Sequence, residues 1–90
     1  MISIPNKEVK NIVTNLMRGK RNVDVATLQQ FLISENKGRA ANLLGRVGAT
    51  AYFGGLTRAA LAEFQLNAGI KPAWGYFGPI TRAYLCSHYN

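Results

Sequence analysis

The stretch Tyr52-Phe53-Gly54-Gly55-Leu56-Thr57-Arg58-Ala59-Ala60-Leu61 recurs 24 positions later as Tyr76-Phe77-Gly78-Pro79-Ile80-Thr81-Arg82-Ala83-Tyr84-Leu85, with seven of ten positions identical. Each copy is an aromatic pair, a glycine turn and the start of a helix. Gly54 and Gly78 are expected to permit backbone angles that other residues resist. Pro79 suits the first turn of a helix, where its missing N–H costs little. Because two copies are too few for a solenoid, the repeat predicts a duplicated helix start within a compact bundle.

The rest of the chain also predicts helices. Apolar residues recur at three-to-four spacing over Ser3–Met17 and over residues 24–34, where Asp24 is a candidate N-cap. A short helix is expected from Ala40 to Gly48, and the two turn copies lead into helices at about 56–68 and 79–88. Thr57 and Thr81 are expected to satisfy N–H groups of the first helical turns, and the later helices should turn Leu56, Ala60, Phe64, Ile80 and Tyr84 inward.

Composition limits the possible functions. The 90 residues suit one small domain, and 48% of them are hydrophobic, too many for a disordered chain. Eleven Lys and Arg against four Asp and Glu give a net charge of +7, which favours an anionic partner. One Cys and one His exclude an internal disulfide and a zinc module of four Cys and His ligands. Cys86 and His88 are two positions apart on the expected helix, so their side chains point in different directions and do not form a nucleophile and base pair. We therefore expect no catalytic residues, no metal and no cofactor.

Several motifs in a fixed order resemble the peptidoglycan-binding-domain-like family. They are the Val25–Leu32 helix with its Leu-Gln pair, the two Tyr-Phe-Gly turns, Phe64-Gln65 and Asn67-Ala68-Gly69-Ile70. The resemblance covers roughly residues 18 to 86 and implies an all-α fold with a compact three-helix core and short accessory helices. It also implies a noncatalytic wall-targeting role. The acidic residue that usually opens the family's turn is absent, because Thr50-Ala51 and Trp74-Gly75 stand there.

The ligand candidates are the turn aromatics and the paired arginines, namely Tyr52, Arg58, Trp74, Tyr76 and Arg82. Aromatic rings could stack on sugar or peptide, and the arginines could grip a carboxylate or a phosphate. For the arginines, a solvated helix face or a salt bridge is the alternative. Trp74 is the strongest candidate because its Gly/Pro-rich loop offers little to bury it. The turn anchors are expected to be structural, and they are Phe53, Gly54, Phe77, Gly78 and Pro79.

Three functions follow from these patterns. The first is a noncatalytic module for peptidoglycan or another anionic wall polymer, formed by residues 18–90 with a helical extension at 1–17. The second is a basic nucleic-acid-binding protein, motivated by Arg18-Gly19-Lys20-Arg21. The third is a protein-interaction subunit whose N-terminal helix packs on a partner. The start of the chain shows no signal-peptide pattern, so we expect a cell-wall or extracellular location if the chain is excised from an exported protein and a cytoplasmic one if it is complete. No stretch is long and apolar enough to span a membrane.

Overall fold

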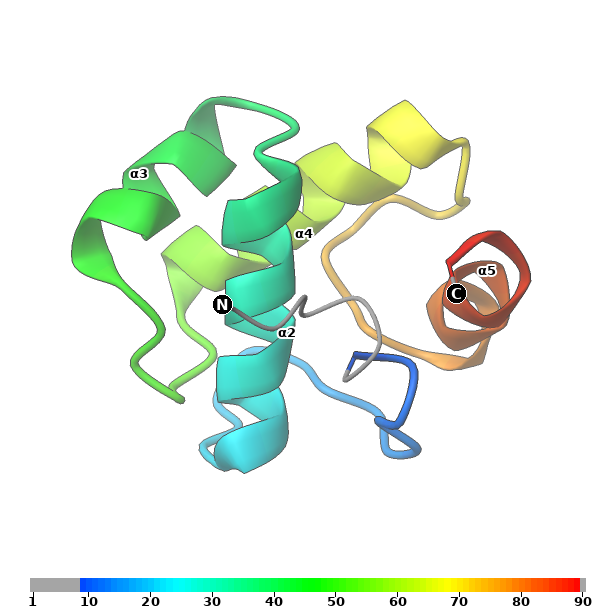
Figure 1. Cartoon of the computed structure of the whole chain (residues 1–90), viewed down its shortest axis with the longest axis horizontal. Helices are drawn as coiled ribbons and strands as arrows, with labels where there is room; N and C mark the ends of the chain where they lie inside the picture. Colours follow the sequence, from blue (N-terminus) through cyan, green and yellow to red (C-terminus); the bar gives the residue numbers. More distant parts are fainter. Residues whose placement is uncertain (1–8, 90) are drawn as a thin grey trace.

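The structure is a computed structural model that describes residues 9–89, and this range holds four α-helices. They are α2 (Val23–Glu35), α3 (Arg39–Val47), α4 (Gly55–Ala68) and α5 (Pro79–His88). Each lies within one or two residues of the range expected from the sequence. Extended pairing among the described residues is limited to two isolated bridges. The all-α fold class is therefore confirmed (Figure 1).

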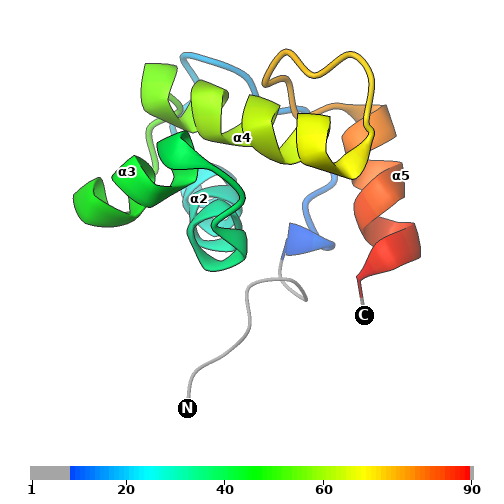
Figure 2. The same cartoon turned by 90° about the horizontal axis from the view of Figure 1, so that it is seen from above.

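Three of the helices pack against one another, and α5 lies to one side of them. α4 contacts both α2 and α3, and α5 stands beyond the C-terminal end of α4 (Figure 2). Aromatic side chains join α5 to the rest. Phe64 of α4 meets Phe31 of α2 edge-to-face at 5.2 Å and Tyr84 of α5 at 6.2 Å between ring centroids. The three-helix core is thus extended by a fourth helix through one aromatic cluster.

The end of the chain closes this cluster. The Tyr89 ring packs edge-to-face on Phe31 at 5.3 Å, and its hydroxyl donates to Glu35 Oε1 at 2.9 Å. Burial, this hydrogen bond and the charge of Glu35 raise the pKa of the Tyr89 phenol well above its usual range. The phenol therefore stays protonated and keeps donating throughout the physiological pH range.

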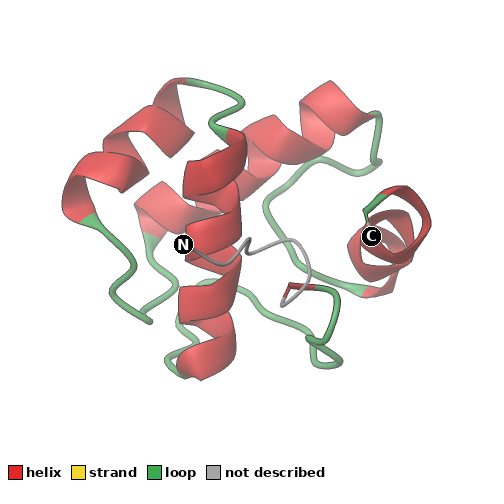
Figure 3. Cartoon of the chain, in the orientation of Figure 1, coloured by secondary structure: helices red, strands yellow, loops and turns green. Residues whose placement is uncertain are grey.

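The segment before α2 departs from expectation. The helix predicted over Ser3–Met17 is wrong for residues 12–17, because residue 9 is helical, residues 10 and 11 form a turn, and residues 12–22 are extended or turning (Figure 3); residues 3–8 lie outside the described range. Leu16 forms a two-way backbone pair with Phe77, with N···O distances of 2.9 and 2.8 Å. Val9, Ile12 and Leu16 are buried in the core that the helices share. Their helical spacing comes from a turn followed by an extended stretch, and their apolar side chains are covered by the chain itself.

A buried glutamine organises the first turn. Gln29 of α2 is 1% exposed. Its Oε1 accepts from the Ala51 N–H at 2.9 Å, and its Nε2 donates to the Tyr52 carbonyl and the Thr57 hydroxyl, both at 2.9 Å. The hydroxyl of Thr57 is thus an acceptor for this amide, and no side chain caps α4, contrary to the expectation from the sequence.

The second turn repeats this arrangement with Gln65 of α4. Gly75 N–H donates to its Oε1 at 2.9 Å, and its Nε2 donates to the Tyr76 carbonyl at 2.8 Å and to the Thr81 hydroxyl at 2.9 Å. Both turns bury their phenylalanine completely. The matched contacts explain why each sequence copy needs its Thr and why each is accompanied by a Gln from a preceding helix.

The turn glycines serve a different purpose from the one expected. Gly54 and Gly78 have φ of −104° and −121°, which any residue adopts. A Cβ on Gly54 would lie 3.1 Å from the ring of Tyr52, and one on Gly78 only 2.4 Å from the ring of Tyr76. The prediction of unusual backbone angles is therefore wrong, and glycine instead leaves room for the tyrosine ring, more tightly at Gly78 than at Gly54.

The left-handed position falls earlier in the turn. Ala51 has φ +71° and Gly75 has φ +82°, so the first turn holds an alanine where the second has a glycine. The missing acidic residue is partly replaced, since the Thr50 hydroxyl accepts from the Tyr52 N–H at 3.2 Å.

The start of α2 also differs from expectation: Asn22 is its N-cap, accepting from Val25 N–H at 3.0 Å, and Asp24 lies in the first turn.

Replacing Gln29 by leucine should destabilise the fold strongly. The change leaves the Ala51 N–H, the Tyr52 carbonyl and the Thr57 hydroxyl without this partner, and each unsatisfied buried group costs about 1–3 kcal/mol. We expect a loss of about 3 kcal/mol or more in the free energy of unfolding, measured by urea denaturation. The neighbouring exposed Gln30→Leu is the control, expected to change stability by less than about 0.5 kcal/mol. Equal losses for the two variants would contradict the role of the amide.

Exchanging the residues at the two left-handed positions should have opposite effects. Ala51→Gly removes the strain of an L-residue in this region, about 1–2 kcal/mol, against a smaller gain in unfolded-chain entropy. We expect a net stabilisation of about 0.5–1 kcal/mol. Gly75→Ala adds the strain and brings Cβ within 2.4 Å of the Arg58 carbonyl oxygen, so it should destabilise by about 2 kcal/mol or more. Thermal unfolding of both variants tests this; a shift of the same sign for both would refute the assignment.

Candidate functional site

An apolar groove opens between the loop after α4 and the first turn of α5. It has a volume of about 280 Å³ and is lined by Ile70, Lys71, Pro72, Trp74, Tyr76, Gly78, Pro79, Ile80 and Thr81. Trp74 is 70% exposed and Tyr76 is 42% exposed. The structure therefore brings two of the sequence candidates, Trp74 and Tyr76, together in one concave surface. We call this surface the Trp74 groove.

The loop that carries Trp74 is held firmly at both ends. α4 ends at Ala68 and is capped by Gly69, which has φ +78°, and the Ile70 N–H donates back to the Gln65 carbonyl at 2.9 Å. The Gln65 side chain then fixes Gly75, whose α-carbon lies so close to Arg58 that no side chain would fit there. An aromatic side chain between two such fixed points is presented without a large loss of loop entropy on binding.

The wall of the groove is mainly aliphatic and aromatic. Ile80 was expected to turn inward from α5, but it is 58% exposed, and Thr81 takes the buried position. The reason is the bond of the Thr81 hydroxyl to Gln65, which turns this side of the helix toward the core. Lys71 supplies the charge in the lining, so the groove suits a ligand with an apolar part and an anionic group.

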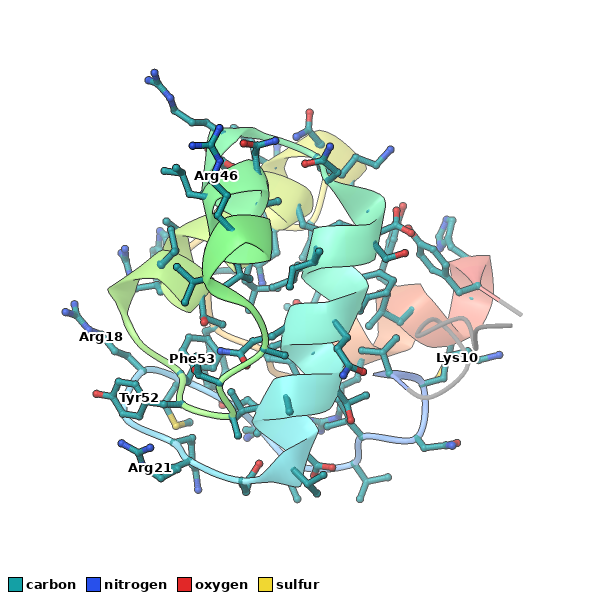
Figure 4. The ribbon with its side chains drawn as sticks, turned by 60° about the vertical axis from the view of Figure 1, so that its left-hand side comes forward. Lys10, Arg18, Arg21, Arg46, Tyr52 and Phe53 are labelled. Carbon is teal, nitrogen blue, oxygen red and sulfur yellow. The ribbon has the colours of Figure 1, made fainter. Side chains whose placement is uncertain are left out.

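The equivalent surface of the first turn is occupied differently. Tyr52 is 39% exposed, and the Arg21 guanidinium lies over its ring at 4.6 Å from the centroid. Arg18 reaches Gly55, the first residue of α4. Figure 4 shows Arg18, Tyr52 and Arg21 gathered on one side of the molecule. Tyr52 thus lies in a cationic surrounding and does not line the Trp74 groove.

The two repeat arginines also lie outside the groove lining. Arg58 is exposed on α4, with the start of its side chain against Gly75. Arg82 is half-buried and donates to the Asn15 side chain, which ties α5 to the segment before α2. The five candidates therefore do not converge on one place: Trp74 and Tyr76 share the groove, and the other three lie elsewhere.

Sequence reasoning missed the rest of the groove. The sequence predicts only a loop at Ile70, Lys71 and Pro72, and it predicts a core position for Ile80. No local signal marks Ile80 as a groove residue, because its exposure follows from the packing of α5 with Thr81 turned toward Gln65.

Two residues near the C-terminus carry potentially reactive side chains, namely Cys86 and His88. Cys86 is an exposed thiol. The His88 ring stacks on Tyr84 at 4.0 Å between centroids, and its Nδ1 lies 3.0 Å from the Tyr84 carbonyl. Within residues 9–89, no three His, Cys, Asp or Glu side chains come together as metal ligands would, and no helix has the length and apolar character to cross a membrane.

Comparison with known proteins identifies the module. A family model described as "Putative peptidoglycan binding domain" matches residues 21–85. This range includes both turns, both organising glutamines and the Trp74 groove up to α5. No match was found among curated proteins or among solved structures. The matched range is well over half of the 90 residues, so the chain belongs to the peptidoglycan-binding-domain family.

Proposed function

We propose that this chain is a noncatalytic wall-binding module that holds the peptide part of peptidoglycan in the Trp74 groove. Family membership supports a role in peptidoglycan binding in general. The observation that favours this particular surface is a tryptophan 70% exposed on a fixed loop beside an apolar groove. Large exposed aromatics at the centre of a concave surface are the side chains that usually contribute most to binding.

The chemistry of the lining favours peptide over sugar. A sugar ring offers many hydroxyls, which need several polar side chains, whereas this lining is mostly aliphatic and aromatic. The Thr81 hydroxyl is already engaged by Gln65. A short peptide with small apolar side chains and a free carboxylate matches the groove, with Trp74 and Ile80 against the methyl groups and Lys71 beside the carboxylate. Such binding forms and breaks no covalent bond, and it places the module at the wall.

The rival functions lose part of their support. The protein-interaction hypothesis requires the apolar side chains of the N-terminal segment to pack on a partner. Val9, Ile12 and Leu16 of that segment lie in the core of the chain itself. The basic residues at 18–21 that motivated nucleic-acid binding remain exposed.

Binding to purified peptidoglycan sacculi tests the proposal. Wild-type protein should sediment with sacculi at low salt, and Trp74→Ala should weaken binding about tenfold or more, as loss of a central aromatic does. The control is Leu66→Ala on α4, which removes a side chain that is 73% exposed and lies outside the groove. It should bind within about twofold of wild type. Absence of sedimentation, or equal losses for the two variants, would refute the proposal.

A second experiment tests whether the peptide or the glycan is the ligand. The wild-type protein should no longer sediment with sacculi from which an amidase has removed the peptides, because the glycan strands alone have few apolar groups to place in the groove. Retained binding to the stripped glycan would show that the sugar is the ligand and would overturn this part of the proposal.

A further inference from the structure

Three cations stand close together on the loop before α2. Arg18, Lys20 and Arg21 are all exposed, and residues 9–23 contain no Asp or Glu. We call residues 18–21 the basic loop. A large share of the +7 charge is therefore concentrated in four residues, outside the Trp74 groove.

The basic loop is held in a fixed register against the first turn. Gly19 N–H donates to the Phe53 carbonyl at 2.8 Å, and Phe53 N–H donates to the Lys20 carbonyl at 2.8 Å. Arg21 is bridged to Tyr52, and the following Asn22 N–H donates to the Ala51 carbonyl at 3.1 Å. Since Phe53 is fully buried, the backbone beneath these cations is anchored directly in the core.

The described carboxylates are engaged elsewhere. Asp24 accepts from the Thr14 hydroxyl at 3.4 Å, Glu35 from the Tyr89 hydroxyl at 2.9 Å, and Glu63 from the Ala40 N–H at 2.9 Å. Each of these partners is neutral. The positive field of the basic loop is thus available to an outside anion.

The two arginines lie on different sides of Tyr52. The Arg21 guanidinium lies over the Tyr52 ring, and Arg18 approaches from the side of α4 (Figure 4). A tetrahedral phosphate can accept from donors outside one plane, whereas a carboxylate accepts mainly within its plane. The guanidinium fork by itself matches phosphate and carboxylate oxygens alike, so the preference comes from the spread of the donors around Tyr52. This arrangement favours phosphate over carboxylate.

The same geometry disfavours nucleic acid. Proteins that bind single strands usually stack bases on exposed aromatic rings. The ring of Tyr52 is covered by Arg21 and lies against Gly54, so a base could stack there only by displacing the guanidinium. The surface offers charge and hydrogen-bond donors but no free aromatic face.

We propose that the basic loop, together with the Tyr52 hydroxyl, docks the phosphate groups of a flexible phosphate polymer that is not a nucleic acid. Several closely spaced phosphates on one polymer can meet Arg18, Lys20 and Arg21 at the same time, which favours a polymer over a single small anion. This surface and the Trp74 groove have no lining residue in common, so one module binds two chemically different components.

Binding of fluorescently labelled inorganic polyphosphate, followed by anisotropy, tests this inference. The Arg18→Gln/Arg21→Gln double variant should bind about tenfold more weakly at about 50 mM salt. Its plot of log K against log salt should be flatter by about 1.4, or about 0.7 per lost contact. The matched control is Arg39→Gln/Arg46→Gln on α3, which removes the same charge from two exposed positions and should lose about threefold or less. Thermal unfolding checks that both double variants remain folded.

Three further binding measurements separate this surface from the Trp74 groove and phosphate from other anions. Trp74→Ala should keep its polyphosphate affinity, so failure of the groove and failure of this surface can be told apart. Weaker binding of polyglutamate than of polyphosphate at matched charge would support phosphate selectivity. Equal losses for the two arginine pairs, equal binding of polyglutamate, or tighter binding of a single-stranded oligonucleotide would each overturn the proposal.

Discussion

A buried side-chain amide fixes each of the two turns, and much of the remaining structure follows from it. The amide of Gln29 or Gln65 offers an acceptor and a donor side by side, so it satisfies an N–H at a left-handed residue and the carbonyl of the next residue together. The same NH₂ group then reaches the threonine in the first turn of the following helix. With the backbone held in this way, the phenylalanine enters the core and the tyrosine ring lies against its glycine. Leucine has a similar size but supplies none of these hydrogen bonds, which is why a largely apolar core contains two glutamines and the two threonines that they contact.

The fixed turn also explains how a domain this small can expose large aromatic side chains. Below about 100 residues, a chain buries a limited share of its surface and needs most of its apolar side chains in the core. Here the two fully buried phenylalanines and the edge-to-face cluster around Phe64 supply that core. Trp74 and Ile80 are left outside it, on a backbone whose geometry the Gln65 amide maintains. Exposure of these residues therefore does not require a flexible loop.

Much of the fold could be predicted from the sequence, because the helices carry strong periodic patterns and clear ends at Asn36, Gly48 and Gly69. The segment before α2 could not. Ile12 and Leu16 have helical spacing, but Leu16 is extended because its backbone pairs with that of Phe77, which is far away in the sequence. The role of Gly54 and Gly78 was hidden for the same reason, since the restriction comes from a neighbouring ring and not from the backbone. At the site, Trp74 and Tyr76 were visible as loop aromatics, but Lys71 and Ile80 join them only through the packing of α5. Contacts between residues far apart in the chain carry little local signal.

The two turns share a backbone and differ in what the preceding chain brings to them. The segment that pairs with the second turn contributes Leu16, whose side chain is buried, and leaves the surface beside Trp74 open. The segment that pairs with the first turn contributes Arg18, Lys20 and Arg21, which remain at the surface around Tyr52. Equivalent tyrosines therefore have different neighbours: Tyr76 lines an apolar groove, and Tyr52 lies beneath a guanidinium. The difference arises in residues 16–21, and only the last of these falls within the range matched by the family model. The shared turn thus fixes where a surface is presented, and the segment of chain paired with each turn decides the chemistry of that surface.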